Sequence, residues 1–293
     1  MRSEMLNSMP RYIIIGDVHG CAAELETLLE KLNTTPNDII ISLGDITDKG
    51  PESVEALNLL YDYDAILVDS NHDQRYKKYL KKSLSAADVN AKNIKEEYKA
   101  EYSKIVSNHI ASNYLKKSVP FTEITVAGQL FTFVHAGVTP YMDLYNLDTR
   151  HWGEFLRVRY LNAETLGFIR MVKIDKDKFP DEVASWRPEH DNVIEWQKAY
   201  DRRYGIVVHG HIIVGPNPHM WIGDTTENTK KHEIGRWRWK DKFDINLLKD
   251  AQVKAFSLDT GAHKGWNLTA LVIEEDSEQA YFEQVEVNTC YEP

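Results

Sequence analysis

Six short apolar runs recur along the chain, and each of them breaks off into glycine and polar residues. The runs span residues 12–15, 39–43, 65–68, 130–134, 206–208 and 255–258. They are rich in β-branched and aromatic residues, and runs of this length and composition predict strands that are buried on both faces. Such a chain is therefore expected to fold around sheets that are covered on both sides.

Helical patterns separate the early strands. Leucines spaced along one face predict a helix over residues 22–32, and residues 53–61, which follow Pro51, predict a second one. Strands that alternate with helices indicate βαβ units and a largely buried sheet.

The C-terminal part adds two further predicted strands, at residues 267–273 and 281–287. We expect them to be antiparallel and to close a second sheet. The prediction is an α/β fold, a two-layer β-sandwich flanked by helices, in a single domain that spans residues 1–293. Residues 74–117 are expected to form a helical cap, and residues 212–255 an irregular C-terminal insertion.

Side chains suited to metal binding follow the predicted strands, where active sites of α/β sheets lie. The set comprises Asp17, His19, Asp45, Asp48, Asn71, His72, His135, His209, His211 and Asp259. Carboxylate, imidazole and amide ligands suit divalent ions such as manganese, iron or zinc. Two such ions about 3.5–4 Å apart clamp a phosphate and activate water near neutral pH. Asp45, in the middle of the set, is the natural bridging carboxylate.

Each cluster taken alone has an ordinary structural explanation. An Asp-x-His after a strand can be a helix cap beside a surface histidine, and an Asn-His pair can be a turn. Six strand ends that each carry a candidate ligand or acid would be a large coincidence on that explanation. The combination therefore favours a catalytic site.

Charge is unevenly distributed along the chain. The net charge of −10 argues against non-specific nucleic-acid binding as the whole function. Residues 74–117, however, hold 11 Lys/Arg against 4 Asp/Glu. This segment could attract a polyanion such as a nucleotide or an RNA end, or it could be a solvated amphipathic helix pair. Arg236-Trp-Arg-Trp239 could likewise stack on bases or pack the insertion down.

Cellular location is predicted from cysteines and from apolar stretches. Cys21 and Cys290 form no metal-ligand spacing and no disulfide framework, which fits a reducing compartment. The first ten residues lack a signal-like apolar stretch, and no run approaches the roughly 18 apolar residues of a membrane span. We expect a cytoplasmic protein with no membrane partner, and the sequence predicts no oligomeric state.

Five blocks resemble, in order, the signatures of calcineurin-like metallophosphoesterases, and in particular their phosphoprotein phosphatase branch. They are Gly16-Asp-Val-His-Gly20, Gly44-Asp-Ile-Thr-Asp-Lys-Gly50, Asn71-His-Asp73, His135-Ala-Gly137 and Gly210-His211. The resemblance covers residues 12 to 273. It implies a phosphatase that uses two divalent metal ions, manganese first, with iron, zinc or nickel as alternatives.

The resemblance also implies residue roles. The implied metal ligands, with Asp45 as the bridge, are Asp17, His19, Asp45, Asn71, His135 and His211. The family's Gly-His pattern selects His211 over His209. His72 would be the general acid that protonates the leaving group, and Asp48 would orient its imidazole.

Substrate-binding residues are expected from the same resemblance. Lys49 stands where the family has an arginine, and it offers phosphate a point charge in place of a bidentate fork. Arg187 is the candidate for a second phosphate-binding arginine, although Trp186 and Arg187 could equally form a structural pair, and Arg157 and Arg159 are further options. Asp259 resembles a functional aspartate of the bacterial branch, although it could also be a turn residue that accepts backbone amides.

Three functions follow from these observations. The first is a phosphomonoesterase similar to bacterial and phage serine/threonine phosphatases. The second is a nucleotide-directed hydrolase, similar to symmetrical diadenosine tetraphosphate hydrolases or to the phosphatase module of polynucleotide kinase-phosphatases, which acts on nucleic-acid ends. The third is a weakly active protein that binds a phosphorylated ligand, and the intact ligand set argues against it.

Overall fold

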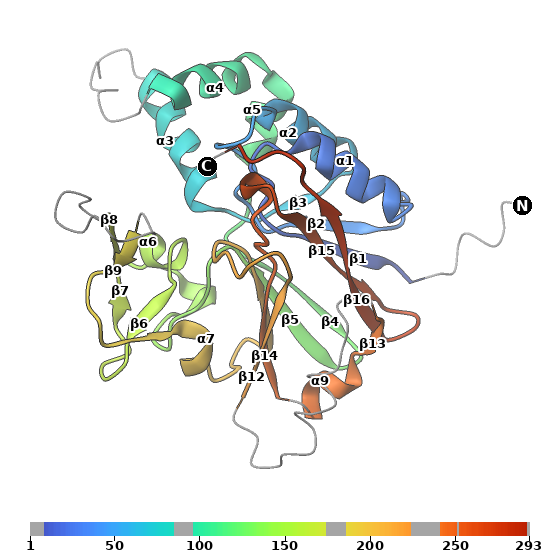
Figure 1. Ribbon diagram of the computed structural model, residues 1–293, viewed down its shortest axis with the longest axis vertical. Helices are drawn as coiled ribbons and strands as arrows, with labels where there is room; N and C mark the ends of the chain where they lie inside the picture. The colour runs from blue at the N-terminus through green and yellow to red at the C-terminus, as the bar shows by residue number, and fades with distance from the viewer. Residues whose placement is uncertain (1–8, 85–95, 174–185, 224–240, 251, 292–293) are drawn as a thin grey trace, which may run out of the picture.

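The computed structural model describes residues 9–84, 96–173, 186–223, 241–250 and 252–291, with two large sheets at the centre (Figure 1). The strands are β1 (Arg11–Ile15), β2 (Ile39–Ser42), β3 (Ile66–Leu67), β4 (Thr122–Val126), β5 (Gln129–Val134), β6 (Tyr160–Asn162), β7 (Phe168–Ile169), β8 (Met171–Lys173), β9 (Trp186–Pro188), β10 (Val193–Glu195), β11 (Ile206–His209), β12 (His219–Ile222), β13 (Phe243–Asp244), β14 (Val253–Ser257), β15 (Asn267–Glu274) and β16 (Gln279–Glu286). The α-helices are α1 (Ala22–Lys31), α2 (Ser53–Asp62), α3 (Asn71–Leu84), α4 (Glu96–Ser107), α5 (His109–Leu115), α6 (Trp152–Phe155), α7 (Trp196–Ala199) and α9 (Asn246–Asp250), with short 3₁₀ turns η2 (Leu144–Asn146) and η3 (Ala262–Lys264).

The first sheet has the strand order β13-β16-β15-β1-β2-β3. β1 pairs in parallel with β2, and β2 pairs in parallel with β3, as the predicted βαβ units require. β15 and β16 are antiparallel, which confirms that expectation. Their expected place in a second sheet is wrong, because β15 pairs antiparallel with β1. β15 fits this central place because both of its faces are apolar: Val272 packs under the helices and Leu271 packs between the sheets.

The second sheet has the order β12-β14-β11-β5-β4. β11 lies at its centre and pairs in parallel with both β5 and β14. β12, at the edge, pairs antiparallel with β14. The segment 212–255 is thus not wholly irregular, because β12 and the start of β14 belong to this sheet. Arg236–Trp239 lie outside the described residues.

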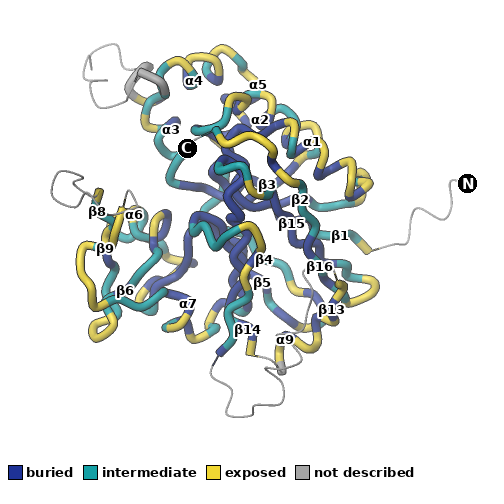
Figure 2. The backbone as a smooth tube through the Cα atoms, viewed as in Figure 1, coloured by how far each residue is buried: buried dark blue, intermediate teal, exposed yellow. Residues whose placement is uncertain are grey.

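Three apolar cores hold the layers together. In β1, Ile13 packs against the helices, while Ile14 lies in the core between the sheets with Phe131 of β5. On the outer face of the second sheet, Val207 packs against Trp196 of α7. The buried residues gather along the two sheets and the loops that leave them (Figure 2). The predicted α/β fold with two packed, covered sheets is confirmed.

The segment 74–117 contains most of α3 together with α4 and α5, and residues 85–95 lie outside the described part. Tyr76, Tyr102 and Leu115 are buried in the same core as α1 and α2. The segment is therefore packed against the body of the protein. None of the described helices is both long and apolar enough to span a membrane.

Candidate metal centre and active site

The polar clusters meet where the parallel strands of both sheets end. β1, β2 and β3 lead into them from the first sheet, and β5, β11 and β14 lead into them from the second. The loops turn sharply there, with left-handed backbone at His19 (φ 48°), Asp45 (47°), Asp48 (70°), Lys49 (76°) and His211 (61°). This conformation is uncommon for residues other than glycine and concentrates at functional sites. Backbone hydrogen bonds join two of these loops, from the N–H of His19 to the carbonyl oxygen of Asp45 at 2.7 Å and from the N–H of Gly50 to that of His19 at 2.9 Å.

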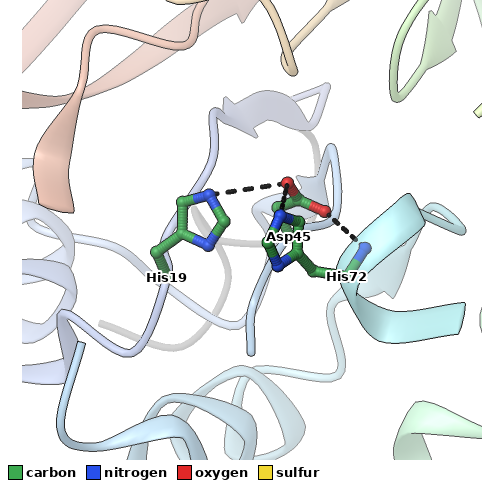
Figure 3. A group of neighbouring side chains, drawn as sticks. All are labelled: His19, Asp45 and His72. Carbon is green, nitrogen blue, oxygen red and sulfur yellow. Dashed lines mark hydrogen bonds and ion pairs between the residues drawn. The ribbon is translucent and has the colours of Figure 1, made fainter. Parts of the chain in front are cut away.

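Asp45 lies at the centre of the site and is nearly fully buried. Its Oδ2 is 3.5 Å from Nε2 of His19 and 3.8 Å from Nε2 of His72. Figure 3 shows how the three side chains lie around one another. Oδ1 of Asp45 is 3.4 Å from Nε2 of His135. Two groups of potential metal ligands share this carboxylate: His19, Asp45 and His72 in one, and Asp45, His135 and His211 in the other. A bridging ligand requires this arrangement.

Backbone carbonyls orient two of the imidazoles. Nδ1 of His135 donates to the carbonyl oxygen of Leu43 at 2.9 Å, and Nδ1 of His19 donates to that of Thr47 at 3.1 Å. In the neutral ring Nε2 then carries a lone pair, which is how metal-ligating histidines are usually held. Nε2 of His135 is also 2.8 Å from Oδ1 of Asn71. Three acceptors, on His135, Asn71 and Asp45, therefore face one another, and a cation between them would relieve their repulsion.

The ionisation of the buried groups also fits a site that holds a cation. Burial lowers the pKa of His135, and it lowers those of His19 and His211 well below the usual range. Neutral imidazole is the form that binds metal. Burial would raise the pKa of Asp45, but His135, His72 and His19 hold it well below its usual range.

Asp17 is the second buried carboxylate of the site. Its Oδ2 lies 4.0 Å from Nε2 of His19, and both of its oxygens accept from the backbone N–H of His211 at 3.1 Å. Burial, followed by the carboxylates of Asp259 and Asp45, raises the pKa of Asp17 well above its usual range. A bound cation would reverse that shift, since the ion would be the largest local charge. The donor set therefore fits divalent metal ions.

The structure brings His211, and not His209, to Asp45. Nε2 of His209 lies instead 2.9 Å from Nε2 of Gln197 and 2.7 Å from Oγ of Ser257, in a buried polar cluster behind the site. Residues two apart on a strand would share a face. The two side chains separate because β11 ends at His209 and the backbone is left-handed at His211 (φ 61°). Nε2 of His211 accepts from Nε of Arg159 at 3.2 Å, so in the neutral ring Nδ1 carries the proton and Nε2 carries the lone pair that a metal would use.

His72 and Asp48 form a hydrogen-bonded pair beside Asp45. Nδ1 of His72 lies 2.7 Å from Oδ2 of Asp48, and the opposite nitrogen, Nε2, faces the Asp45 carboxylate. His72 sits in the first turn of α3, where its backbone N–H donates to Oδ1 of Asp45 at 3.1 Å. This pairing holds one ring nitrogen and leaves the other directed at the reacting centre.

The predicted substrate-binding residues are separated in space. Lys49 lies at the site, with Nζ 3.2 Å from Nε2 of His263. Asp259 is buried there, and burial raises its pKa while the Lys49 ammonium opposes that rise. Arg187 lies on exposed strand β9, which pairs with β8 in a separate small sheet. Arg159, which contacts His211, is closer to the chemistry.

Sequence reasoning missed three residues that the structure places at the site. His263 packs edge-on to His19 at 4.6 Å between ring centroids, and burial lowers its pKa to about 3. It follows the Asp259 cluster in sequence, so extending that cluster past Gly261 would have included it. Arg75 and Tyr102 both contact Asp48, but they belong to the segment 74–117, for which the sequence predicted a helical cap and a positive charge and no site residue.

Comparison with known proteins gives a consistent result. Residues 10–215 match the family model described as calcineurin-like phosphoesterase. A relative from Wigglesworthia glossinidia brevipalpis, named bis(5'-nucleosyl)-tetraphosphatase, symmetrical, is 28% identical over 278 residues, which cover 89% of this chain and 94% of the relative. A relative from Bacillus subtilis (strain 168), named asymmetrical bis(5'-nucleosyl)-tetraphosphatase PrpE, is 31% identical over 181 residues, which cover 56% of this chain and 72% of the relative. The crystal structure of a metallophosphoesterase from Sphaerobacter thermophilus aligns with a TM-score of 0.53 at 19% identity, over 96% of this chain and 89% of that one.

Proposed function

Because this chain belongs to the calcineurin-like phosphoesterase family, we propose that it hydrolyses phosphomonoesters with water activated between two divalent metal ions. The observation that carries the proposal is the position of Asp45. One oxygen of this buried carboxylate lies 3.5 Å from Nε2 of His19 and the other lies 3.4 Å from Nε2 of His135, so that it is shared by two groups of potential ligands. His72 also lies in the first group, and we assign it a different role because Asp48 holds its Nδ1.

The proposed ligands divide around Asp45. Asp17 and His19 would complete the first ion's site, and Asn71, His135 and His211 would complete the second. When bound, the ions would stabilise charge on the phosphoryl oxygens and lower the pKa of the attacking water. Manganese is our first candidate because carboxylate, imidazole and amide oxygen suit it, and iron, zinc and nickel are alternatives.

His72 is proposed to hold the proton that the leaving group needs. Asp48 accepts from Nδ1, so a protonated ring presents its Nε2–H toward the phosphoester oxygen. That donation prevents the departure of a bare alkoxide, and general acid catalysis of this kind contributes about 10²–10⁴-fold. Substrates with poor leaving groups depend on it most.

Basic residues around the centre would bind the phosphoryl group. Lys49, fixed beside His263, and Arg159, fixed beside His211, lie where they can contact phosphate oxygens. Burial lowers the pKa of the Arg157 guanidinium, and the charge of Asp45 opposes that shift only in part. Arg187 stays a prediction from sequence, and Asp259 is proposed to fix Lys49 by its charge.

The proposed substrate is a phosphomonoester of a protein or a small molecule. Dinucleoside polyphosphates are the second candidate, because the relative matched along 94% of its length is named for that activity. A manganese-supplemented screen should compare a phosphopeptide, diadenosine tetraphosphate and a 3′-phosphorylated oligonucleotide. Hydrolysis of the phosphopeptide at least tenfold faster than the other two would support the first candidate, and the reverse order would exclude it.

Metal content tests the two-ion part of the proposal. Manganese-loaded protein, freed of excess metal by gel filtration, should contain close to two ions per chain by mass spectrometry. A maximum of one ion at saturating manganese would contradict the shared-carboxylate interpretation.

Leaving-group dependence tests His72. His72→Ala should lower kcat about 100-fold or more on an alkyl phosphate but only a few-fold on 4-nitrophenyl phosphate, whose leaving group needs little protonation. His190→Ala, at an exposed histidine, is the control. Equal losses on both substrates would remove His72 from the general-acid role.

The chain is further proposed to act as one domain in the cytoplasm. Both cysteines are free thiols, Cys21 buried and Cys290 exposed, and a reducing compartment keeps thiols in that state.

A further inference from the structure

Oδ2 of Asp48 accepts hydrogen bonds from three side chains. Besides Nδ1 of His72 at 2.7 Å, it accepts from Nη1 of Arg75 at 2.7 Å and from the hydroxyl of Tyr102 at 3.2 Å. Asp48 is fully buried, and its φ of 70° is costly for a residue other than glycine. A buried charge in a strained turn persists only where its surroundings hold it.

Two of these donors come from outside the strand-end blocks quoted above. Arg75 lies one helical turn after His72 on α3, and Tyr102 lies on α4. The main-chain N–H of Asp48 also donates to Oε1 of Glu101 on α4 at 2.9 Å. Helix α4 therefore holds Asp48 through both its side chain and its backbone.

Aromatic neighbours hold both donors, Arg75 and Tyr102, in place. The Arg75 guanidinium lies 4.7 Å from the ring centroid of Tyr98, which stacks on Tyr102 at 6.1 Å and 18°. Tyr102 is fully buried, and its ring also meets Tyr76 edge-on at 5.6 Å. Stacking on an aromatic face and pairing with a carboxylate together restrict an arginine to one orientation.

We propose that Arg75 and Tyr102 are positioning residues that act through Asp48 to aim His72 at the leaving group. The helical segment 74–117, which contains them, is then part of the catalytic machinery. Part of its positive charge, that of Arg75, pairs with the buried carboxylate of Asp48. The inference rests on the proposed general-acid role of His72 and extends it to residues that contact no reacting atom.

The contact pattern favours this role over direct phosphate binding. Nη1 of Arg75 bonds to the same oxygen that holds Nδ1 of His72, behind the ring and away from Nε2, which faces Asp45. The Tyr102 hydroxyl is buried and directed at Asp48. Removal of either donor would let the Asp48 carboxylate rotate and take the imidazole with it.

The test measures kcat and KM across leaving groups with manganese-loaded Arg75→Met and Tyr102→Phe. Arg75→Met should lower kcat on an alkyl phosphate by about 10- to 100-fold, and Tyr102→Phe by about 3- to 10-fold. Both should stay within about threefold of wild type on 4-nitrophenyl phosphate, with unchanged metal content and unchanged inhibition by inorganic phosphate. Arg75→Lys should restore part of the loss, because a point charge still pairs with Asp48.

Matched controls come from the same segment. Lys78→Met removes an exposed positive charge from α3, and Tyr79→Phe removes a hydroxyl beside Tyr102 that bonds only weakly to Ser103, at 3.5 Å. Both should behave as wild type on every substrate. A loss in Lys78→Met equal to that in Arg75→Met would assign the effect to general charge and overturn the proposal.

Two further results would overturn it. Equal losses on both leaving groups with weaker phosphate inhibition would make Arg75 a phosphate-binding residue, and unchanged rates would make both contacts merely structural. His72→Ala and Asp48→Asn separate this failure from a failure of the proposed function. If those two variants show the leaving-group effect and the Arg75 and Tyr102 variants do not, only the present inference fails. If none of them shows it, the general-acid assignment fails as well.

Discussion

Gly210 lies where the end of β11 passes against Asp17, and no side chain fits between them. A Cβ built on Gly210 would lie 1.9 Å from Oδ1 of Asp17 and 3.1 Å from its Cγ. Ordinary carbon–oxygen contacts begin at about 3.3 Å, so Gly210→Ala must displace the carboxylate or the strand by roughly 1.4 Å. Gly210 is not in the left-handed region, so the backbone tolerates alanine and the effect is steric.

The displacement falls on the proposed metal centre. Asp17 accepts from the backbone N–H of His211, and the N–H of Gly210 donates to the carbonyl oxygen of His135 at 2.9 Å. A shift of about 1 Å in catalytic groups costs about 100-fold in rate. We therefore expect kcat/KM for 4-nitrophenyl phosphate to fall about 100-fold, and bound manganese to fall toward one ion per chain.

Folding should be affected much less than catalysis. Overpacking typically costs about 1–3 kcal/mol, which corresponds to a loss of a few degrees in Tm for a chain of this size. Gly153→Ala is the matched control, because its Cβ would meet nothing within 4 Å on an exposed helical turn. A Gly210→Ala enzyme with two bound ions and a rate within threefold of wild type would refute the placement of Asp17 as a ligand.

Three further predictions address other parts of the molecule. Asp45→Asn should abolish hydrolysis and reduce bound manganese to less than one ion per chain, because it weakens both sites at once; retained activity would show that Asp45 is no bridge. His263→Leu should weaken inhibition by inorganic phosphate about tenfold, since Lys49 loses the ring nitrogen that holds it, and should add nothing to Lys49→Met; additive losses would indicate an effect through His19 instead. Because burial raises the pKa of Cys21 to about 12, its thiol should resist maleimide labelling in native protein at pH 8 while exposed Cys290 reacts; labelling of both, seen by peptide mass spectrometry, would contradict the buried position.

One departure from the family pattern, at Ser70, is explained by the hydrogen bonds of its side chain. In the family whose sequence blocks this chain resembles, a glycine is usual at the position of Ser70, before Asn71-His72. Oγ of Ser70 accepts from the N–H of Asp73 at 3.1 Å and donates to Oδ2 of Asp73 at 2.7 Å, which caps the start of α3. Asp73 in turn accepts from the N–H of Thr47 at 3.1 Å. Ser70 therefore fixes Asp73, and Asp73 ties the helix that carries His72 to the loop that carries Asp45.

The sequence by itself determined the strands and the residues that follow them. Apolar runs such as 12–15 and 206–208 became β1 and β11, because a run that is apolar on both faces is stable only inside a covered sheet. Parallel strands present their carboxyl ends at one edge. The polar residues after neighbouring parallel strands were therefore bound to meet, and His19 and Asp45, after β1 and β2, do so within 3.5 Å. The approach of His135 to Asp45 depends in addition on how the second sheet packs against the first.

Only the tertiary structure decided which partners those residues found. Pairing of β15 with β1, the contact of Lys49 with His263 and the contact of Tyr102 with Asp48 join parts of the chain that are far apart in sequence. Periodicity reports which face of one element is apolar, and it carries no information about which distant element will cover that face. For the same reason, the sequence did not predict the contact of Arg75 with Asp48. Its charge was visible in the sequence, but packing of α3 and α4 around Asp48 turned that charge inward.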